Sequence, residues 1–413
     1  MIFSAKLSRY LLVITAILVV SIVLPYFYSM LFYNSYPVPR VYFSSVSHDF
    51  IFTKAGVKDM LRYDRNGKSY TREEFERLTP LFNYRQLLYR EEMPDSLNGV
   101  KLDIQDVKLN NVFYAIKPYE IFRYTIMLNP LIESAPGRPD LQMPREFFRI
   151  DEKMEFIDCS TNKTMSEMSN LFNNALIENG FGFPAKGIFG NPSTRKPFDE
   201  GYLVIDSNDK LFHIKRIQNK PFVRKVEIPE GIKIDYIYLR ESNLREQYAL
   251  FITDENKIFI ISYDNYKLIE VPSDGYDRRE MQLVIKGNLF YREIGFVSDK
   301  KVKTIVTDRN YKVIDTYEET LKTNEDYLVG DVSNYLFPFK LSLTNADNLY
   351  VDFYSKFSDF RFLIVSSILA IFYFVFSKKH ENKSQLTNLL DAVIILFTGI
   401  YGLIAVVLIK LES

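Results

Sequence analysis

Three apolar segments stand out from a chain that otherwise alternates between hydrophobic and polar positions. Residues 10–32 form an almost unbroken apolar run, and about 23 residues at about 1.5 Å each cross a ~30 Å hydrocarbon core. Residues 388–410 suffice for a second full crossing. Residues 362–376 are too short alone, so we expect that helix to begin near Phe357 and to cover 357–377. The pattern predicts three transmembrane α-helices, with the last two joined as a hairpin.

The first apolar segment reads as an uncleaved signal-anchor. Lys6 and Arg9 precede it, as in a secretory signal, but only bulky residues follow it. A signal peptidase site needs small residues at that place. We therefore expect the segment to stay in the membrane, with a removed signal peptide as the alternative.

Positive charges predict the orientation. Short flanks rich in lysine and arginine remain cytoplasmic. Lys6 and Arg9 flank the first helix, and the hairpin loop carries three lysines, at positions 378, 379 and 383. Three crossings then give a protein of the cytoplasmic (inner) membrane with a cytoplasmic N-terminus. Residues 33–356 and the C-terminus are predicted to be extracytoplasmic.

From residue 201 to residue 356 the chain shows short strands separated by polar turns. Strands at 203–205 and 211–214 flank the turn Asp206–Asp209, and strands at 249–252 and 258–263 repeat this design. A third copy follows, and a weaker fourth surrounds a turn near Asp347. Turn lysines recur at intervals of 47 and 44 residues, at Lys210, Lys257 and Lys301.

Recurrence at about 45 residues with several strands per unit is typical of propeller blades or blade-like meanders. A series of unrelated hairpins with similar spacing remains the alternative. The predicted fold class is a membrane-anchored, mainly β protein, with a partial or irregular propeller-like meander, helical inserts and three transmembrane helices.

Residues 33–200 are less regular and predict an α+β region. Asn66-Gly67 is a favoured hairpin turn. Thr71 and Glu74 form a capping-box pattern at the start of one helix, and Thr164–Glu167 forms another before an apolar helical face that Gly180 ends.

Composition narrows the classes of function. The chain has 52 Lys and Arg against 52 Asp and Glu, so it lacks the basic surplus that nucleic-acid binding requires. A hydrophobic content of 47% indicates folded domains. Its single cysteine, Cys159, excludes an intrachain disulfide, and three histidines leave few ligands for a metal centre. We expect no cofactor.

Candidate catalytic motifs fail on their spacing. The glycine-rich stretch 180–190 lacks the Lys-Ser or Lys-Thr of a phosphate-binding loop after Gly187, and its helix precedes the loop instead of following it. Asp206–Asp209 begins like a calcium loop, but Lys210 occupies a ligand position. His48 and His213 lie far apart in sequence. We therefore assign no catalytic, cofactor-binding or metal-binding residue, and an enzymatic role is less favoured than a binding role.

A polar, proline-kinked stretch after the glycines is a possible contact loop. Its candidate residues are Asn191, Ser193, Thr194, Arg195 and Lys196, and exposed loops of this kind often carry binding functions. An ordinary connection between domains is the alternative. Within the membrane segments, Asp391 is expected to sit at position N3 of a helix capped by Asn388, where the helix dipole favours an acid.

The whole arrangement resembles an uncharacterised family of bacterial integral-membrane proteins. The resemblance rests on one N-terminal span, a large β-rich extracytoplasmic domain, a C-terminal two-span hairpin and the loop GNPSTRKPFDEGY, Gly190–Tyr202. It implies a location alongside ABC-transporter ATPases and supplies no catalytic residues.

These observations lead to two main hypotheses. The first is a non-enzymatic membrane accessory or sensor subunit with an extracytoplasmic binding domain, within an ABC-transporter-type complex. Its partners would be the lipid bilayer and other membrane subunits, with no nucleic acid. The alternative is a membrane-tethered hydrolase or lyase that acts on envelope polymers. That enzyme would need a deep pocket with convergent carboxylates or a Ser/His pair.

Overall fold

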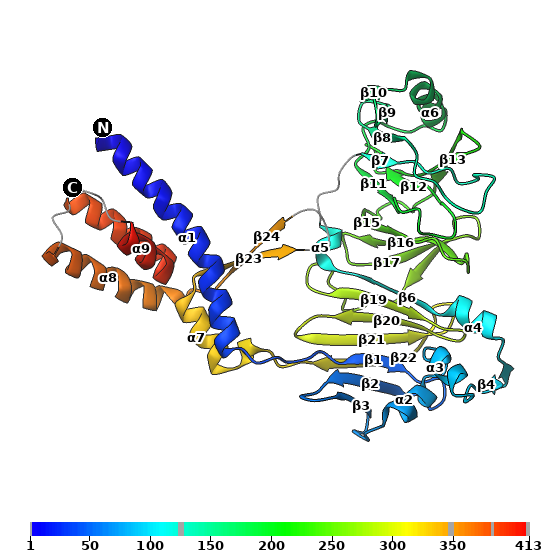
Figure 1. The fold of residues 1–413 in the computed structure, drawn as a ribbon, viewed down its shortest axis with the longest axis horizontal. Helices are drawn as coiled ribbons and strands as arrows, with labels where there is room; N and C mark the ends of the chain where they lie inside the picture. The colour runs from blue at the N-terminus through cyan, green and yellow to red at the C-terminus, as the bar shows by residue number, and fades with distance from the viewer. Residues whose placement is uncertain (1, 123–127, 346–350, 381–383, 410–413) are drawn as a thin grey trace. The chain divides into compact units, whose positions relative to one another are not determined.

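The computed structural model describes residues 2–122, 128–345, 351–380 and 384–409. The chain divides into two compact units (Figure 1). Met1–Tyr36 and Lys322–Ser413 form one, which we call the terminal unit, and Pro37–Leu321 forms the other, the central unit. Each unit is described by itself.

Three antiparallel meanders make up most of the central unit. In each meander, strands that are consecutive in the sequence pair side by side (Figure 1). The strands are β11 (Gly187–Gly190), β12 (Tyr202–Ile205), β13 (Leu211–Ile217) and β14 (Lys220–Val226); β15 (Ile234–Leu239), β16 (Gln247–Thr253), β17 (Ile258–Ser262) and β18 (Leu268–Val271); and β19 (Gln282–Gly287), β20 (Arg292–Val297), β21 (Lys301–Thr307) and β22 (Val313–Thr320).

The first three predicted repeats are confirmed as meanders. The strands at 203–205 and 211–214 are β12 and β13, and those at 249–252 and 258–263 are β16 and β17. Asp209 and Asn256 adopt left-handed φ angles of 61° and 65° in the connecting turns, which these residue types tolerate. In the described part of the chain, the sheets close into neither a barrel nor a propeller.

The fourth predicted repeat is wrong as a blade. Its residues form the helix α7 (Leu328–Leu336) and a separate two-stranded hairpin of β23 (Phe339–Asn345) and β24 (Val351–Phe357). They belong to the terminal unit. The turn expected near Asp347 lies outside the described residues. Alternation alone predicted the strands, but it carries no information on which sheet they join.

Smaller elements complete the central unit. They are β1 (Arg40–Phe43), β2 (Phe50–Ala55) and β3 (Met60–Asp64) in one sheet; α2 (Arg72–Leu78), α3 (Tyr84–Tyr89), β4 (Ser96–Leu97), β5 (Val100–Lys101), α4 (Ile104–Asn110), β6 (Val112–Ile116) and α5 (Pro118–Ile121); and β7 (Asn129–Pro130), β8 (Glu146–Ile150), β9 (Met154–Asp158) and β10 (Lys163–Thr164) in a second sheet, followed by α6 (Ser166–Glu178).

Of the two predicted capping boxes, one is formed. Thr71 accepts a hydrogen bond from the Glu74 amide, and the Glu74 carboxylate accepts one from the Thr71 amide. The helix α6 exists, but Met165 is its N-cap and provides no side-chain bond. Its predicted end is confirmed, since Gly180 has a φ of 77° and the Phe181 amide donates to the Leu176 carbonyl.

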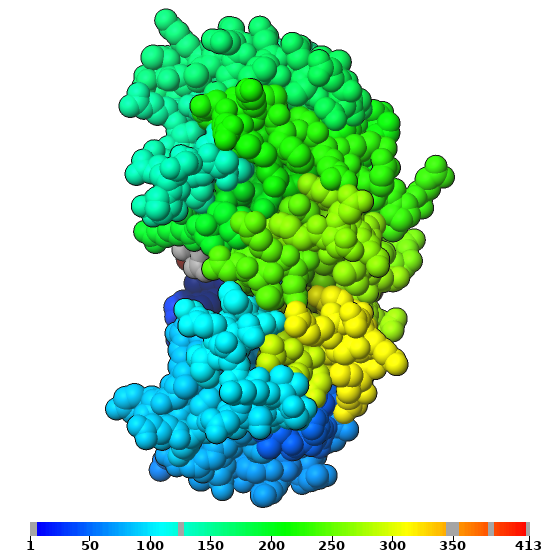
Figure 2. All heavy atoms as spheres, turned by 90° about the vertical axis from the view of Figure 1, so that its right-hand side faces the viewer, coloured from blue at the N-terminus to red at the C-terminus, as the bar shows by residue number. Residues whose placement is uncertain are grey.

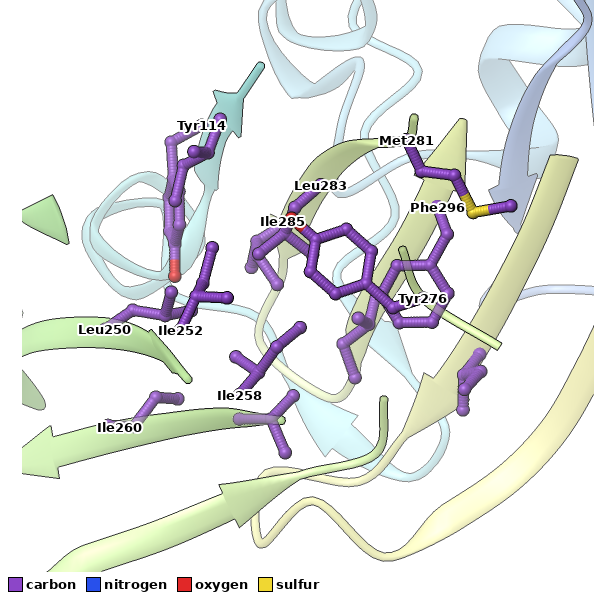
Figure 3. Close-up of a cluster of buried hydrophobic side chains, with 14 of the residues drawn as sticks. Tyr114, Leu250, Ile252, Ile258, Ile260, Tyr276, Met281, Leu283, Ile285 and Phe296 are labelled. Atoms are coloured by element: carbon purple, nitrogen blue, oxygen red, sulfur yellow. The ribbon is translucent and has the colours of Figure 1, made fainter. Parts of the chain in front are cut away.

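The third meander gains a fifth strand from far upstream. The strand β6 pairs antiparallel with β19, beside which it is drawn in Figure 1. On the surface shown in Figure 2, cyan and yellow parts of the chain, which are far apart in the sequence, likewise lie next to one another. Tyr114 of β6, labelled in Figure 3, lies in a cluster of buried side chains that joins the second and third meanders. Because each buried aliphatic or aromatic side chain contributes about 1.5–3 kcal/mol, this cluster holds the two meanders together.

The terminal unit contains three apolar helices, α1 (Ile2–Phe32), α8 (Phe362–His380) and α9 (Gln385–Leu408). By length and composition, α1 and α9 can cross a membrane, and α8 contains a shorter apolar stretch. The expected start of α8 near Phe357 is wrong, because Phe357 is the last residue of β24. The helix instead gains length at its other end, beyond Phe376.

The helix α9 reverses direction in its middle. Gly399 has φ 57° and ψ −133°, which are not helical values. A straight helix would place Asp391 and Ile409 about 27 Å apart, yet Arg9 contacts both. Its Nε donates to the Ile409 carbonyl at 2.9 Å, and its Nη atoms donate to Asp391 at 2.8 and 2.9 Å.

Close packing of the two arms of α9 supports this reversal. A Cβ atom on Gly402 would lie 3.1 Å from the Cα of Ile395, which only a fold-back can bring so near. Ser377, close to the end of α8, lines one groove together with Val407. Within the described part of 388–410, the chain is therefore not one straight helix.

The predicted role of Asp391 as a helix cap is also wrong. Ser384 is the N-cap of α9, and Asp391 lies fully buried inside the helix. Its carboxylate binds the Arg9 guanidinium with two hydrogen bonds and accepts a third from the Tyr373 hydroxyl at 3.0 Å. The Asn-x-x-Asp spacing fits a local helix cap, but the Asp391 carboxylate pairs instead with Arg9, which is distant in the sequence.

Candidate functional site

The predicted contact loop is the long connection between β11 and β12. Its ends are held by strand pairing, in which Gly190 lies opposite Tyr202. The side chains then divide into two groups. Asn191 and Lys196 point inward to Glu241, while Pro192 and Arg195 are exposed.

Lys196 is the anchor of the loop. Its Nζ lies 2.6 Å from Asp199 Oδ1 and 2.5 Å from Glu241 Oε1, and it donates to the Asn191 carbonyl at 2.7 Å. The three charged side chains are exposed by only 3%, 2% and 0%, respectively. Charges this deeply buried require partners, so we interpret this cluster as a closed internal brace.

Further donors complete the brace. The Asn191 amide group donates to Glu241 Oε2 at 3.0 Å. Asp199 Oδ2 accepts from the Ser134 hydroxyl at 3.0 Å and from the Gly201 amide at 2.8 Å. These neutral donors share the negative charge that one lysine between two carboxylates leaves over.

The outer part of the loop is ordered by local turns. The Ser193 amide donates to Asn191 Oδ1 at 3.2 Å, and the Arg195 amide donates to the Ser193 hydroxyl at 3.0 Å. Thr194 is half-buried, and the Arg195 side chain is exposed. The predicted contact residues thus comprise two anchors, Asn191 and Lys196, and an outer group of Ser193, Thr194 and Arg195.

A second buried cluster follows directly after the loop. His213 contacts the Tyr266 hydroxyl through Nδ1 at 2.7 Å and the Glu200 carbonyl through Nε2 at 2.5 Å. The carbonyl can only accept, so Nε2 carries the proton and Nδ1 accepts from Tyr266. The Glu200 carboxylate binds Lys215 and accepts from the Tyr263 hydroxyl.

The surroundings of His213 keep its imidazole ring neutral. Burial, together with the nearby Lys215 charge, lowers the pKa of His213 to about 3. Burial raises the pKa of Tyr266 and of Tyr263, where the Glu200 carboxylate adds to the effect. Both ring nitrogens of His213 are occupied within the protein, so this geometry gives it a structural role.

Sequence reasoning placed His213 on a strand but missed its partners. Tyr248, Tyr263 and Tyr266 come from β16 and from the turn after β17, and Tyr248 stacks on both of the others at centroid distances of 3.9 and 4.6 Å. No local spacing links these tyrosines to His213. Only the packing of the first two meanders brings them together.

A third cluster lies between the second and third meanders. Arg292 donates two hydrogen bonds to the Glu246 carboxylate, at 3.0 and 2.8 Å, and Arg309 contacts the same carboxylate at 2.5 Å. Burial alone would raise the pKa of Glu246, but these guanidinium groups outweigh it and lower the pKa. Among the described residues, no group of three His, Cys, Asp or Glu side chains is placed to hold a metal ion.

A family model described as a domain of unknown function (DUF4857) matches residues 40–307. The match covers the first two meanders, the contact loop and the strands β19, β20 and β21 of the third meander, whereas β22 and Arg309 lie beyond it. No curated protein matches the chain.

Protonation of His213 should couple stability to pH. Its folded pKa lies below the ordinary value of about 6.5, so the unfolded chain takes up the proton first as the pH falls. The stabilisation is complete above about pH 6.5 and declines toward pH 3, by up to ~1.4 kcal/mol per pH unit. Urea unfolding between pH 6 and 4.5, followed by circular dichroism, should show a shallower slope for His213→Gln. His48→Gln, at an exposed position, is the matched control, and an unchanged slope for His213→Gln would refute the assignment.

Removal of the loop anchor should cost far more than removal of its neighbour. Lys196→Met leaves Asp199 and Glu241 buried without a cation, and breaking a buried pair in this way costs about 3–5 kcal/mol. Arg195→Met changes an exposed side chain and should stay within about 0.5 kcal/mol. Thermal unfolding of the two variants measures the difference. Equal stability would show that Lys196 is not a buried anchor.

Proposed function

The chain belongs to the DUF4857 family, and we propose that it is a non-enzymatic accessory or sensor subunit of a membrane complex. The observation that carries this proposal is the construction of the terminal unit. A tether needs one apolar helix, whereas this unit packs α1, α8 and both arms of α9 around a buried ion pair. Charged residues inside a membrane are costly in free energy, and they usually mark a functional site.

The proposed location is the cytoplasmic membrane, with the N-terminus inside and the central unit outside. Arg9 is neutralised by Asp391, so Lys6 and the two lysines in the last turn of α8, Lys378 and Lys379, support the orientation. Lys383 lies outside the described residues. Because α9 reverses at Gly399, its end lies beside Arg9. We therefore place the C-terminus on the cytoplasmic side, instead of outside as three crossings had predicted.

Apolar helix surfaces offer a place for other subunits. On α8, five side chains recur at helical spacing and are each exposed by more than half; they are Ile364, Ile368, Ile371, Phe372 and Val375. Such a stripe faces lipid or a neighbouring helix. Association with an ABC-transporter-type complex is supported by the family resemblance described above, and the contact loop with its exposed Arg195 is the proposed contact element of the outer domain.

The alternative enzyme hypothesis fits the geometry less well. It requires carboxylates that converge in an open pocket. Asp199 and Glu241 do converge, but on Lys196 and with almost no exposure. His213 is engaged on both nitrogens. These closed clusters support a binding role better than a hydrolytic one.

Recovery of partners tests the proposal. The full chain, crosslinked in cells and purified in mild detergent, should bring down at least one further membrane protein together with an ATPase. Ile368→Ala and Phe372→Ala on the α8 stripe should reduce this recovery, because they remove exposed contact area. Phe397→Ala, which is equally exposed on α9, is the matched control. If the native chain is recovered without any membrane or ATPase partner, the proposal is wrong.

A further inference from the structure

The sheet of the third meander has one face that is only half covered. Its inner face carries Leu283, Ile285 and Phe296 into the cluster of Figure 3. On its outer face, the sheet of β1–β3 covers β21 through Val41, Phe43, Phe50 and Phe52, which pack on Val302 and Val306. Ala115 of β6 and Val284 of β19, which share this outer face, line a cavity beside the cover.

A cavity of about 430 Å³ lies where the cover ends. Small-molecule sites in proteins have volumes of about 300–1,000 Å³. One wall is the segment from Val38 to Tyr42, and the floor comes from β6, β19 and β20 through Ala115, Val284 and Gly295. Phe113, exposed by 60%, stands at the side of β6.

Two residues of the cavity floor, Ala115 and Gly295, are small and leave the space above them open. A Cβ atom on Gly295 would meet Val284 Cβ at 3.5 Å, an ordinary contact. Gly295 needs no special backbone angle, since its φ is not positive. A larger residue there is therefore tolerated by the strand and would fill the cavity.

The charged side chains that line the cavity are all basic. Among the described residues that line it, two are basic, Arg40 and Lys286, and none is acidic. Lys286 is already engaged: its Nζ lies 2.7 Å from the buried Glu293 carboxylate, donates to the Val41 carbonyl and lies 4.1 Å from the centre of the Tyr42 ring. Arg40 is exposed, and no hydrogen bond or ion pair joins its side chain to any part of the chain that the structure describes.

We propose that this cavity binds an anionic amphiphile. Its carboxylate or phosphate group would pair with the Arg40 guanidinium, which matches such anions with two parallel hydrogen bonds. Its apolar chain would lie on Ala115, Val284 and Gly295, and so remove this surface from water. Such an amphiphile would be the ligand that the proposed sensor subunit detects, and only this biological meaning rests on the proposed function.

Binding of a fluorescent 16-carbon fatty acid to the full chain in nanodiscs of uncharged lipid tests this site. The native protein should give saturable binding that a long-chain alkyl phosphate displaces. Gly295→Val should weaken binding at least about tenfold, equivalent to ~1.4 kcal/mol, and Gly295→Ala should weaken it less. Arg40→Gln should weaken it by a similar factor, whereas Lys220→Gln, at an exposed position of β14, should not.

A second comparison, between the acid and its methyl ester, tests the role of the charged headgroup. The methyl ester of the same acid should bind the native protein about as weakly as the acid binds Arg40→Gln. Circular dichroism checks that each variant keeps its β structure. Equal binding of acid and ester, full binding by Gly295→Val, or saturable binding of an acidic peptide with none of the fatty acid would overturn the proposal.

The outcomes separate this inference from the proposed function. The binding measurement uses purified protein without partners. Recovery of a membrane partner with no probe binding would refute the amphiphile site alone. Probe binding without any recovered partner would support the site and contradict the subunit role.

Discussion

The bidentate pair between Arg9 and Asp391 is the interaction on which the terminal unit depends. Both side chains are almost fully buried among apolar helices, and an unpaired charge there would cost several kcal/mol. Arg9 also holds the carbonyl of Ile409. One residue of α1 therefore binds a point near the start of α9 and its end, and this is possible only because the chain turns back at Gly399. The reversal and the close approach at Gly402 both follow from this arrangement.

Charged side chains in the central unit are also paired within the protein. Lys196 lies between Asp199 and Glu241, Glu246 lies between two arginines, and Lys286 faces Glu293. Each of these charges is paired within the protein, so we interpret the clusters as structural supports for loops and sheets. The Arg40 side chain differs, since it stands unpaired in the described part of the chain at the edge of an apolar cavity. This contrast between matched interior charges and an unmatched rim charge separates structural residues from candidate binding residues.

Local patterns predicted the elements whose causes are local. The strands around Asp206–Asp209, the capping box at Thr71 and the helix end at Gly180 depend on neighbouring residues, and all are present. Three features have distant causes and escaped prediction. The strand β6 joins β19 through a pairing of residues more than a hundred positions apart, Asp391 binds Arg9, and Lys196 turns inward to Glu241. The sequence of the loop shows that Lys196 is polar, but not the direction in which it points.

Labelling with a membrane-impermeant maleimide tests the central claim most directly. The native Cys159 is exposed on the central unit and provides an internal reporter in cells whose outer barrier has been opened. A second chain carries Cys159→Ser and a cysteine added after Ser413. The proposed orientation predicts that Cys159 is labelled, and the reversal of α9 predicts that the added cysteine is labelled only after the membrane is permeabilised. Labelling of the added cysteine in intact membranes would contradict the reversed helix and restore a full third crossing.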